Sequence, residues 1–371
     1  MKTRRTITMK KTNLYMDLHV LQTVPPSCVN RDDTGSPKTA VYGGATRARI
    51  SSQAWKHAIR MTFGNLFDDE KVGMRTKHIP AELAKEIIAL DPTLEDKALA
   101  LALDALNKAG IGTKQEKKDP EAVTKALFFA SRAQLKRLAE LAVCHEEDKK
   151  KYQEALKSEP SIDIALFGRM VADDPSLNFD AAAQVAHAIS THAVHNEYDY
   201  FTAVDDCNPE DTSGAGHLGT VEFNSSTLYR YATVNINELA KLLGNDDAVE
   251  AAIGFAEAFI YSMPDGKQNT FANRTLPDMV YITLRRDMPI NLCGAFEKPV
   301  PASKNGYASA SEEALIHYAN QQYSTFADKP EAALGMGVSQ ELTSIADVLP
   351  HSELMARLSE KISSVLAGEN I

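Results

Sequence analysis

The chain has 371 residues, of which 44% are hydrophobic and 24% charged, and its formal net charge is -10. This length is enough to bury a substantial core in one large domain or two. The acidic balance excludes a free-standing, non-specific nucleic-acid binder, so a site for a polyanion must be local. Residues 1–11 are basic but lack the apolar segment of a secretory signal, and no apolar run approaches the roughly 20 residues that span a bilayer. We therefore expect a cytoplasmic protein without a membrane partner.

Cysteine and histidine spacing predicts neither a metal nor a cofactor. The four cysteines are isolated, so neither a disulfide framework nor a zinc site is expected. His187 and His192 are five residues apart, which does not align ligands on a helix, and His195 belongs to no H-E-x-x-H motif. The sequence has no G-x-x-x-x-G-K-[ST] and no G-x-S-x-G, so we expect no catalytic residue.

The first elements in chain order are a strand and a long loop. Apolar and polar residues alternate over residues 13–22, which predicts a strand with one buried face. Residues 24–44 are rich in Pro, Ser, Gly and Asp and predict a loop, of a size that is usually functional or disordered.

Residues 43–60 form the central stretch: a glycine pair, a short basic strand or loop, a serine cap and a helix that ends near Gly64. Between Thr34 and Phe67 the chain has five basic residues and no Asp or Glu: Lys38, Arg47, Arg49, Lys56 and Arg60. An ordinary solvated helix face, which is the alternative, usually mixes both signs of charge. The unbalanced cations beside a helix N-terminus favour a polyanion as the ligand.

The remaining elements indicate an α+β protein. Residues 80–157 are helical in pattern with no strand signal, which predicts an inserted helical subdomain, and residues 180–195 predict another helix. Residues 198–204 and 219–223 bracket a polar tip and predict a β-hairpin arm. Strands are expected at 228–237 and 279–284, and helices at 246–263, 311–326 and 352–366.

Several motifs recur in a fixed order between about residues 13 and 299. They are PSCVNRDD (26–33), GGATRARISSQAWKHAIR (43–60), DIALFGRM (163–170), AHAISTH (186–192), YFTAVDD (200–206), HLGT (217–220), YRYA (229–232), PDGKQNT (264–270) and AFEK (295–298). In this order and spacing the sequence resembles the CasC family of the RAMP superfamily, the repeated backbone subunit of type I-E CRISPR Cascade complexes.

The resemblance implies a fold in three parts. An RRM/ferredoxin-like palm would comprise residues 13–63, 184–193 and 229–371, the last range including the C-terminal helices. Residues 64–183 would form a helical fingers insertion, and residues 194–228 a β-hairpin thumb.

The resemblance also implies a non-catalytic subunit that polymerises along a guide crRNA as a helical filament. Its partners would be the crRNA, target DNA through the guide, head-to-tail copies of itself and other Cascade subunits. Phosphates are expected to be neutralised by Arg31, Lys38, Arg47, Arg49, Lys56 and Arg60. The register is expected to be fixed by Ser51, Gln53, Lys267, Gln268, Asn269 and Thr270. Such contacts hold any guide sequence.

Three more side chains match family positions that contact bases, and Arg169 is also expected to contact the RNA. Met170, which follows Arg169, matches a methionine that inserts between bases, whereas core filling is the alternative. Phe201 and Leu218 match thumb residues that press on a displaced nucleotide, whereas packing within the hairpin is the alternative.

Two other functions stay open at this point. The pairs Asp32–Asp33 and Asp205–Asp206 are typical turn formers, but Asp32 and Asp33 could instead serve a metal-dependent RNA-cleaving backbone subunit, as in type III complexes. The second alternative is a metabolic α+β enzyme, which predicts a small-molecule pocket and no bound RNA.

Overall fold

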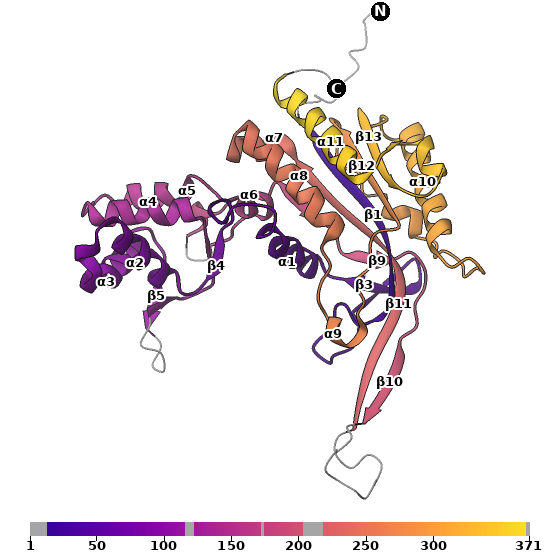
Figure 1. The fold of residues 1–371 in the computed structure, drawn as a ribbon, viewed down its shortest axis with the longest axis horizontal. Helices are drawn as coiled ribbons and strands as arrows, with labels where there is room; N and C mark the ends of the chain where they lie inside the picture. Colours follow the sequence, from indigo (N-terminus) through magenta and orange to yellow (C-terminus); the bar gives the residue numbers. More distant parts are fainter. Residues whose placement is uncertain (1–12, 116–121, 172–173, 203–217, 369–371) are drawn as a thin grey trace, which may run out of the picture.

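The computed structural model describes residues 13–115, 122–171, 174–202 and 218–368. Its centre is a large, mostly antiparallel sheet in the order β14-β13-β12-β1-β11-β9-β3-β2, with β8 and β10 also pairing with β11 (Figure 1). The strands are β1 (Tyr15–Ser27), β2 (Thr39–Tyr42), β3 (Ala45–Ile50), β8 (Ala183–Val185), β9 (Ala188–Ser190), β10 (Glu197–Thr202), β11 (Leu218–Asn235), β12 (Met279–Arg285), β13 (Ala332–Gly337) and β14 (Asp347–Val348).

Helices cover both faces of this sheet. The helices packed on one face are α1 (Ser52–Phe63), α6 (Ile162–Phe167), α7 (Ile236–Leu243), α8 (Asn245–Tyr261) and α11 (His351–Leu366). The other face is covered by α10 (Ala308–Thr325) and the 3-10 helix η4 (Leu292–Phe296). The helices expected at 246–263, 311–326 and 352–366 are confirmed as α8, α10 and α11.

The prediction that residues 13–22 have one buried face is wrong. Leu18 on one face of β1 belongs to the core under α8, and Leu21 on the other belongs to the core under α10 and η4. The polar residues Asp17 and His19 are also buried, at 0% and 1% exposure. Asp17 accepts hydrogen bonds from the Tyr231 hydroxyl (3.0 Å) and the Ile290 N–H (2.9 Å), so buried partners satisfy its carboxylate.

Residues 180–195 form two short strands, not the expected helix. The alanine-rich sequence has good helix propensity, but the backbone of β8 and β9 pairs with the long strand β11. Pairing at the sheet therefore overrides local propensity. The loop expected at 24–44 is also shorter, because β1 continues to Ser27 and β2 begins at Thr39.

The helical insertion has a core of its own. Its main helices are α2 (Ile79–Leu90), α3 (Ala98–Lys108), α4 (Arg132–Val143) and α5 (Lys149–Lys157), and Figure 1 shows them set off to one side of the sheet. Contrary to the purely helical prediction, the segment also contains the short strands β4 (Met74–Thr76), β5 (Thr113–Gln115), β6 (Ala122–Thr124) and β7 (Phe128–Ala130). The remaining 3-10 helices are η1 (Asp69–Lys71), η2 (Pro92–Lys97), η3 (Pro175–Leu177) and η5 (Glu341–Ser344).

The β-hairpin arm is confirmed. β10 pairs with the start of β11, from Glu197 opposite Phe223 to Thr202 opposite Leu218, and the pair extends away from the body of the molecule (Figure 1). The expected polar tip, with Asp205 and Asp206, lies outside the described residues. Within the described ranges, no helix is long and apolar enough to cross a bilayer.

Candidate nucleic-acid interface

Helix α1 is the element on which the candidate site is built. The Ser51 hydroxyl oxygen accepts a hydrogen bond from the Ala54 N–H (3.3 Å) and caps the helix, as predicted. The Ser51 N–H donates to Asn30 Oδ1 (2.9 Å), which joins the cap to the end of β1. Trp55 is buried, with the Arg230 guanidinium 3.8 Å from its ring centroid. These contacts fix one side of α1 to the sheet.

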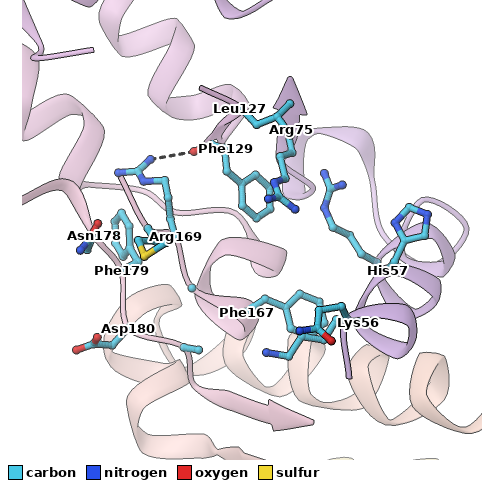
Figure 2. A pocket seen from close by; sticks show the side chains of 15 residues that line it. Lys56, His57, Arg75, Leu127, Phe129, Phe167, Arg169, Asn178, Phe179 and Asp180 are labelled. Atoms are coloured by element: carbon cyan, nitrogen blue, oxygen red, sulfur yellow. Dashed lines mark hydrogen bonds between the residues drawn. The ribbon is translucent and has the colours of Figure 1, made fainter. Parts of the chain in front are cut away.

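The outer side of α1 separates two hollows. The first, of about 540 Å³, lies between α1 and the insertion and is lined by Gln53, Lys56, Arg75 and Met170 among others (Figure 2). The second, of about 480 Å³, is lined by residues on the far side of α1, by Arg31 and by residues 262–266. The exposed His57 lines both hollows, so they meet at the edge of the helix.

Lys56 is a cation without an acidic partner among the residues that the structure describes. Its Nζ lies 5.7 Å from the Phe167 ring centroid, on the wall of the first hollow (Figure 2). Partial burial lowers the pKa of Lys56, because removing water disfavours its charged form. A phosphate in this hollow would supply the missing countercharge.

A second group of open cations follows from β3 towards the end of β1. The Arg49 N–H donates to the Lys38 carbonyl (2.9 Å), and the Lys38 N–H donates to the Asn30 carbonyl (2.8 Å). Arg31, next in the chain, is exposed. Backbone hydrogen bonds therefore hold these three basic residues in one connected segment beside the α1 cap.

The loop that carries Lys267 packs against the same segment. Any Cβ on Gly266 would lie 2.1 Å from the Val29 carbonyl oxygen, so only glycine allows this approach. Burial raises the pKa of the Cys28 thiol; the charges of Arg31 and Lys267 act against that rise, and those of Glu222 and Asp32 add to it. Gln268, Asn269 and Thr270, expected in a loop, begin the short helix α9 (Gln268–Phe271) and are exposed.

Arg47 does not belong to the open cations, and its expected phosphate contact is wrong. Its side chain is buried at 0% exposure. Nη1 donates to the Ser190 carbonyl (2.9 Å), and Nη2 donates to the Phe296 carbonyl (2.8 Å) and the Glu297 carbonyl (3.3 Å). The guanidinium joins β3 to β9 and η4 and faces no solvent.

Arg169 is likewise a structural residue, which corrects its predicted RNA contact. It is 4% exposed and donates to the carbonyls of Phe129, Leu156 and Leu177 and to Gln134 Oε1, at 2.7–3.1 Å. Burial lowers its pKa to about 10. Figure 2 shows the guanidinium directed into the insertion, where it bonds to Phe129.

Arg60 is mostly committed to the protein. Its Nε donates to Asp163 Oδ2 (2.8 Å) and its Nη2 to the Gly73 carbonyl (2.7 Å), and its guanidinium lies 4.8 Å from the Phe129 ring centroid. Asp163, at 0% exposure, also accepts from the Gly73 N–H (2.9 Å). The prediction of an unpaired cation at Arg60 is therefore wrong, because an acid from a distant segment compensates it.

The predicted base-contacting residues differ in exposure. Met170 is 86% exposed at the rim of the first hollow, which rules out core filling. Phe201 is 42% exposed and its ring lies over Gly219, where a Cβ would be only 2.2 Å from Phe201 Cζ. Leu218 pairs with Thr202 through the backbone, and its side chain lies outside the described residues.

Three residues near the hollows were missed from the sequence. Arg75 on β4 is exposed in the first hollow, close to Phe129 (Figure 2), but no strand was expected there. Arg274 lines the second hollow and donates to the Tyr261 carbonyl (3.0 Å). Asn30 lies within the PSCVNRDD motif, but its hydrogen bond to the α1 cap was not predicted from the sequence.

Asp32 and His192, two of the acidic and histidine candidates, have structural roles. Asp32 Oδ1 accepts from the Thr34 N–H (2.9 Å), the Thr34 hydroxyl (2.7 Å) and the Ser36 N–H (3.1 Å), as a turn former does. The Thr34 hydroxyl is the main cause that lowers the pKa of Asp32. His192 Nε2 accepts from the Thr227 N–H (3.1 Å). Across the described ranges, no three His, Cys, Asp or Glu side chains gather as metal ligands.

Comparison with known proteins decides the family. The family described as CT1975-like protein matches residues 16–361. The chain belongs to this family. The chain is also similar to a solved chain of a "CRISPR RNA-guided surveillance complex, pre-nicking", with 34% identity, a TM-score of 0.80, and coverage of 93% of this chain and 99% of the other. A chain of a "CRISPR RNA-guided surveillance complex" is 29% identical, with a TM-score of 0.71 and the same coverages of 93% and 99%.

No curated protein matches the chain. The CT1975-like match and the two structures confirm the resemblance to the CasC family that the sequence motifs indicated. They also confirm the expected α+β class.

Proposed function

We propose that this CT1975-like protein is a crRNA-binding backbone subunit of a type I-E CRISPR Cascade complex. The observation that carries the proposal is a set of five open cations. Lys56 lines the first hollow and Arg31 the second, Lys38 and Arg49 line a smaller hollow with Asn30, and Lys267 follows Gly266. No carboxylate of the described chain lies within ion-pair distance of them. Cations of this kind neutralise phosphates of any sequence, as a carrier of variable guides must.

The proposed palm, fingers and thumb rest on the sheet order. The antiparallel strands β12, β1, β11 and β9 are neighbours in that order, and α1 and α8 pack on one face. This strand order and these two helices support a β-α-β-β-α-β, RRM-like palm. In this proposal residues 64–183 are the fingers and residues 194–228 the thumb.

The arm supports the proposed assembly into a filament. All six residues of β10 are exposed, including Tyr198 at 70% and Tyr200 at 63%. A contact from this arm to a different surface of the next copy is head-to-tail, and such a contact that does not close yields a helical filament. The filament would carry the guide for pairing with target DNA, beside other Cascade subunits and in the cytoplasm. We propose no catalytic role, because Asp32 serves a turn.

The test is binding of a guide-length single-stranded RNA to the purified protein, measured by fluorescence anisotropy at several salt concentrations. A variant with Lys56→Ala and Lys267→Ala is expected to lose affinity and to show a smaller salt dependence. Lys329→Ala, at an exposed site between α10 and β13, is the matched control.

Equal affinity of the double variant and the control would contradict the proposed track. Filaments on RNA, seen by negative-stain electron microscopy, test the assembly separately. Cleavage of the bound RNA with Mg²⁺, lost in Asp33→Ala, would contradict the non-catalytic role.

A further inference from the structure

Arg49 differs from the other open cations because two of its three guanidinium nitrogens have partners. Nε donates to the Thr39 carbonyl (3.2 Å) across the β2–β3 pair. Nη1 lies 3.1 Å from His187 Nδ1. Among the described residues Nη2 has no partner, so one edge of the guanidinium is open to an anion.

The contact with His187 defines the state of its imidazole. Arg49 Nη1 always carries its protons, so His187 Nδ1 must accept and its proton must lie on Nε2. Desolvation, and then the charges of Arg49 and Lys38, lower the pKa of His187. The imidazole is therefore neutral at neutral pH, as the hydrogen bond requires.

The sheet places these two side chains together. Arg49 pairs with Ile189 and Ile50 with Ala188 in the β3–β9 ladder, and His187 comes directly before β9. The position of His187 is thus set by backbone hydrogen bonds, not by its own exposed side chain. An arginine side chain that is hydrogen-bonded to a histidine on this fixed backbone has less conformational freedom before a ligand binds.

We propose that His187 is a positioning residue that holds the Arg49 guanidinium in the orientation that binds an RNA phosphate. This inference rests on the proposed function, since it assigns a second residue to the same RNA track. His187 itself need not touch the RNA. The hydrogen bond to Arg49 gives His187 a role beside the open cations that needs no metal ion.

The experiment compares four full-length variants with the unchanged protein in their affinity for a guide-length RNA at neutral pH. Arg49→Ala is expected to lower affinity about tenfold, because a charge-assisted hydrogen bond to phosphate is lost. His187→Phe is expected to lower it about threefold, since Arg49 must then be ordered on binding. His187→Asn should restore most of the affinity, because its Oδ1 takes the place of Nδ1 as acceptor.

The fourth variant combines Arg49→Ala with His187→Phe and separates positioning from a structural role. It is expected to bind as Arg49→Ala does, because His187 acts only through Arg49. Thermal unfolding of each variant checks the fold, and His187→Ala replaces His187→Phe if the latter unfolds.

Two kinds of result would overturn the inference, and they lead to different conclusions about the RNA track. If Arg49→Ala lowers affinity but His187→Phe does not, or if His187→Phe costs as much again in the Arg49→Ala background, His187 has no positioning role and the RNA track stands. If Arg49→Ala has no effect, the RNA track does not pass Arg49, and the inference falls with that part of the proposed function.

Discussion

Arg47 and Arg49 on β3 differ by two residues and share a face of the strand, yet their surroundings are opposite. Arg47 lies under the segment around η4, whose last carbonyls accept its hydrogen bonds. Arg49 lies beyond this cover and keeps an open nitrogen. The same contrast separates two sets of cations: the closed set is Arg47, Arg60 and Arg169, and the open set is Arg31, Lys38, Arg49, Lys56 and Lys267.

Basic residues that are close in the sequence can therefore have two different roles. The closed ones stabilise the fold, and the open ones are available to bind a polyanion. A closed guanidinium donates to buried carbonyl or carboxylate oxygens, so its removal takes a donor from each of these acceptors. An open cation makes few contacts in the free protein, so its removal leaves the fold unchanged and weakens only the attraction for a polyanion.

The largest effect is expected from Arg169→Leu. This change removes the guanidinium hydrogen bonds to three carbonyls and to Gln134 Oε1 from a buried site, and we expect a loss of about 3–5 kcal/mol in the free energy of unfolding. Urea unfolding followed by circular dichroism measures it. Met170→Ala, at the neighbouring exposed site, is the control and should stay within about 0.5 kcal/mol. A loss of less than about 1 kcal/mol for Arg169→Leu would break the distinction.

Arg60→Ala should have the next largest effect, a loss of about 2–3 kcal/mol in the free energy of unfolding. The reason is that the fully buried Asp163 carboxylate loses its countercharge. The double variant Arg60→Met with Asp163→Asn is expected to recover much of this loss, because no charge is then left buried alone and the Asn oxygen can still accept from the Gly73 N–H. If the double variant is as unstable as the sum of both single changes, the pair is not coupled.

Lys56→Ala tests the open set of cations. We expect stability within about 0.5 kcal/mol of the unchanged protein, because no acid pairs with Lys56 in the described chain. In the plot of log affinity for single-stranded RNA against log salt concentration, the slope should become shallower by about 0.7. An unchanged slope would show that Lys56, although open, contacts no phosphate.

The smallest expected effect concerns pH. Burial lowers the pKa of Lys56, so in the free protein its ammonium loses its proton before an ordinary lysine with a pKa of about 10.4 does. A bound phosphate favours the charged form, so binding takes up protons and RNA affinity should fall as pH rises through the lowered pKa. Lys56→Arg is expected to remove this fall, because arginine stays charged. The same decline in both proteins would exclude Lys56 as its source.

The sequence by itself determined the local features of this protein. The serine cap of α1, the apolar pattern of α8 and the paired segments of the arm are short-range signals, and each is confirmed. The ordered motifs also placed the chain in its family, because they depend on residue identity and spacing alone.

Only the tertiary structure decided which cations are free. The cover over Arg47 comes from residues 296–297 and the countercharge of Arg60 from Asp163, both far away in the chain. Likewise, residues 183–185 and 188–190 are strands because they pair with β11, and α10 and η4 bury the second face of β1. Burial and pairing depend on segments that meet only in the fold, whereas propensity and periodicity act within a few residues.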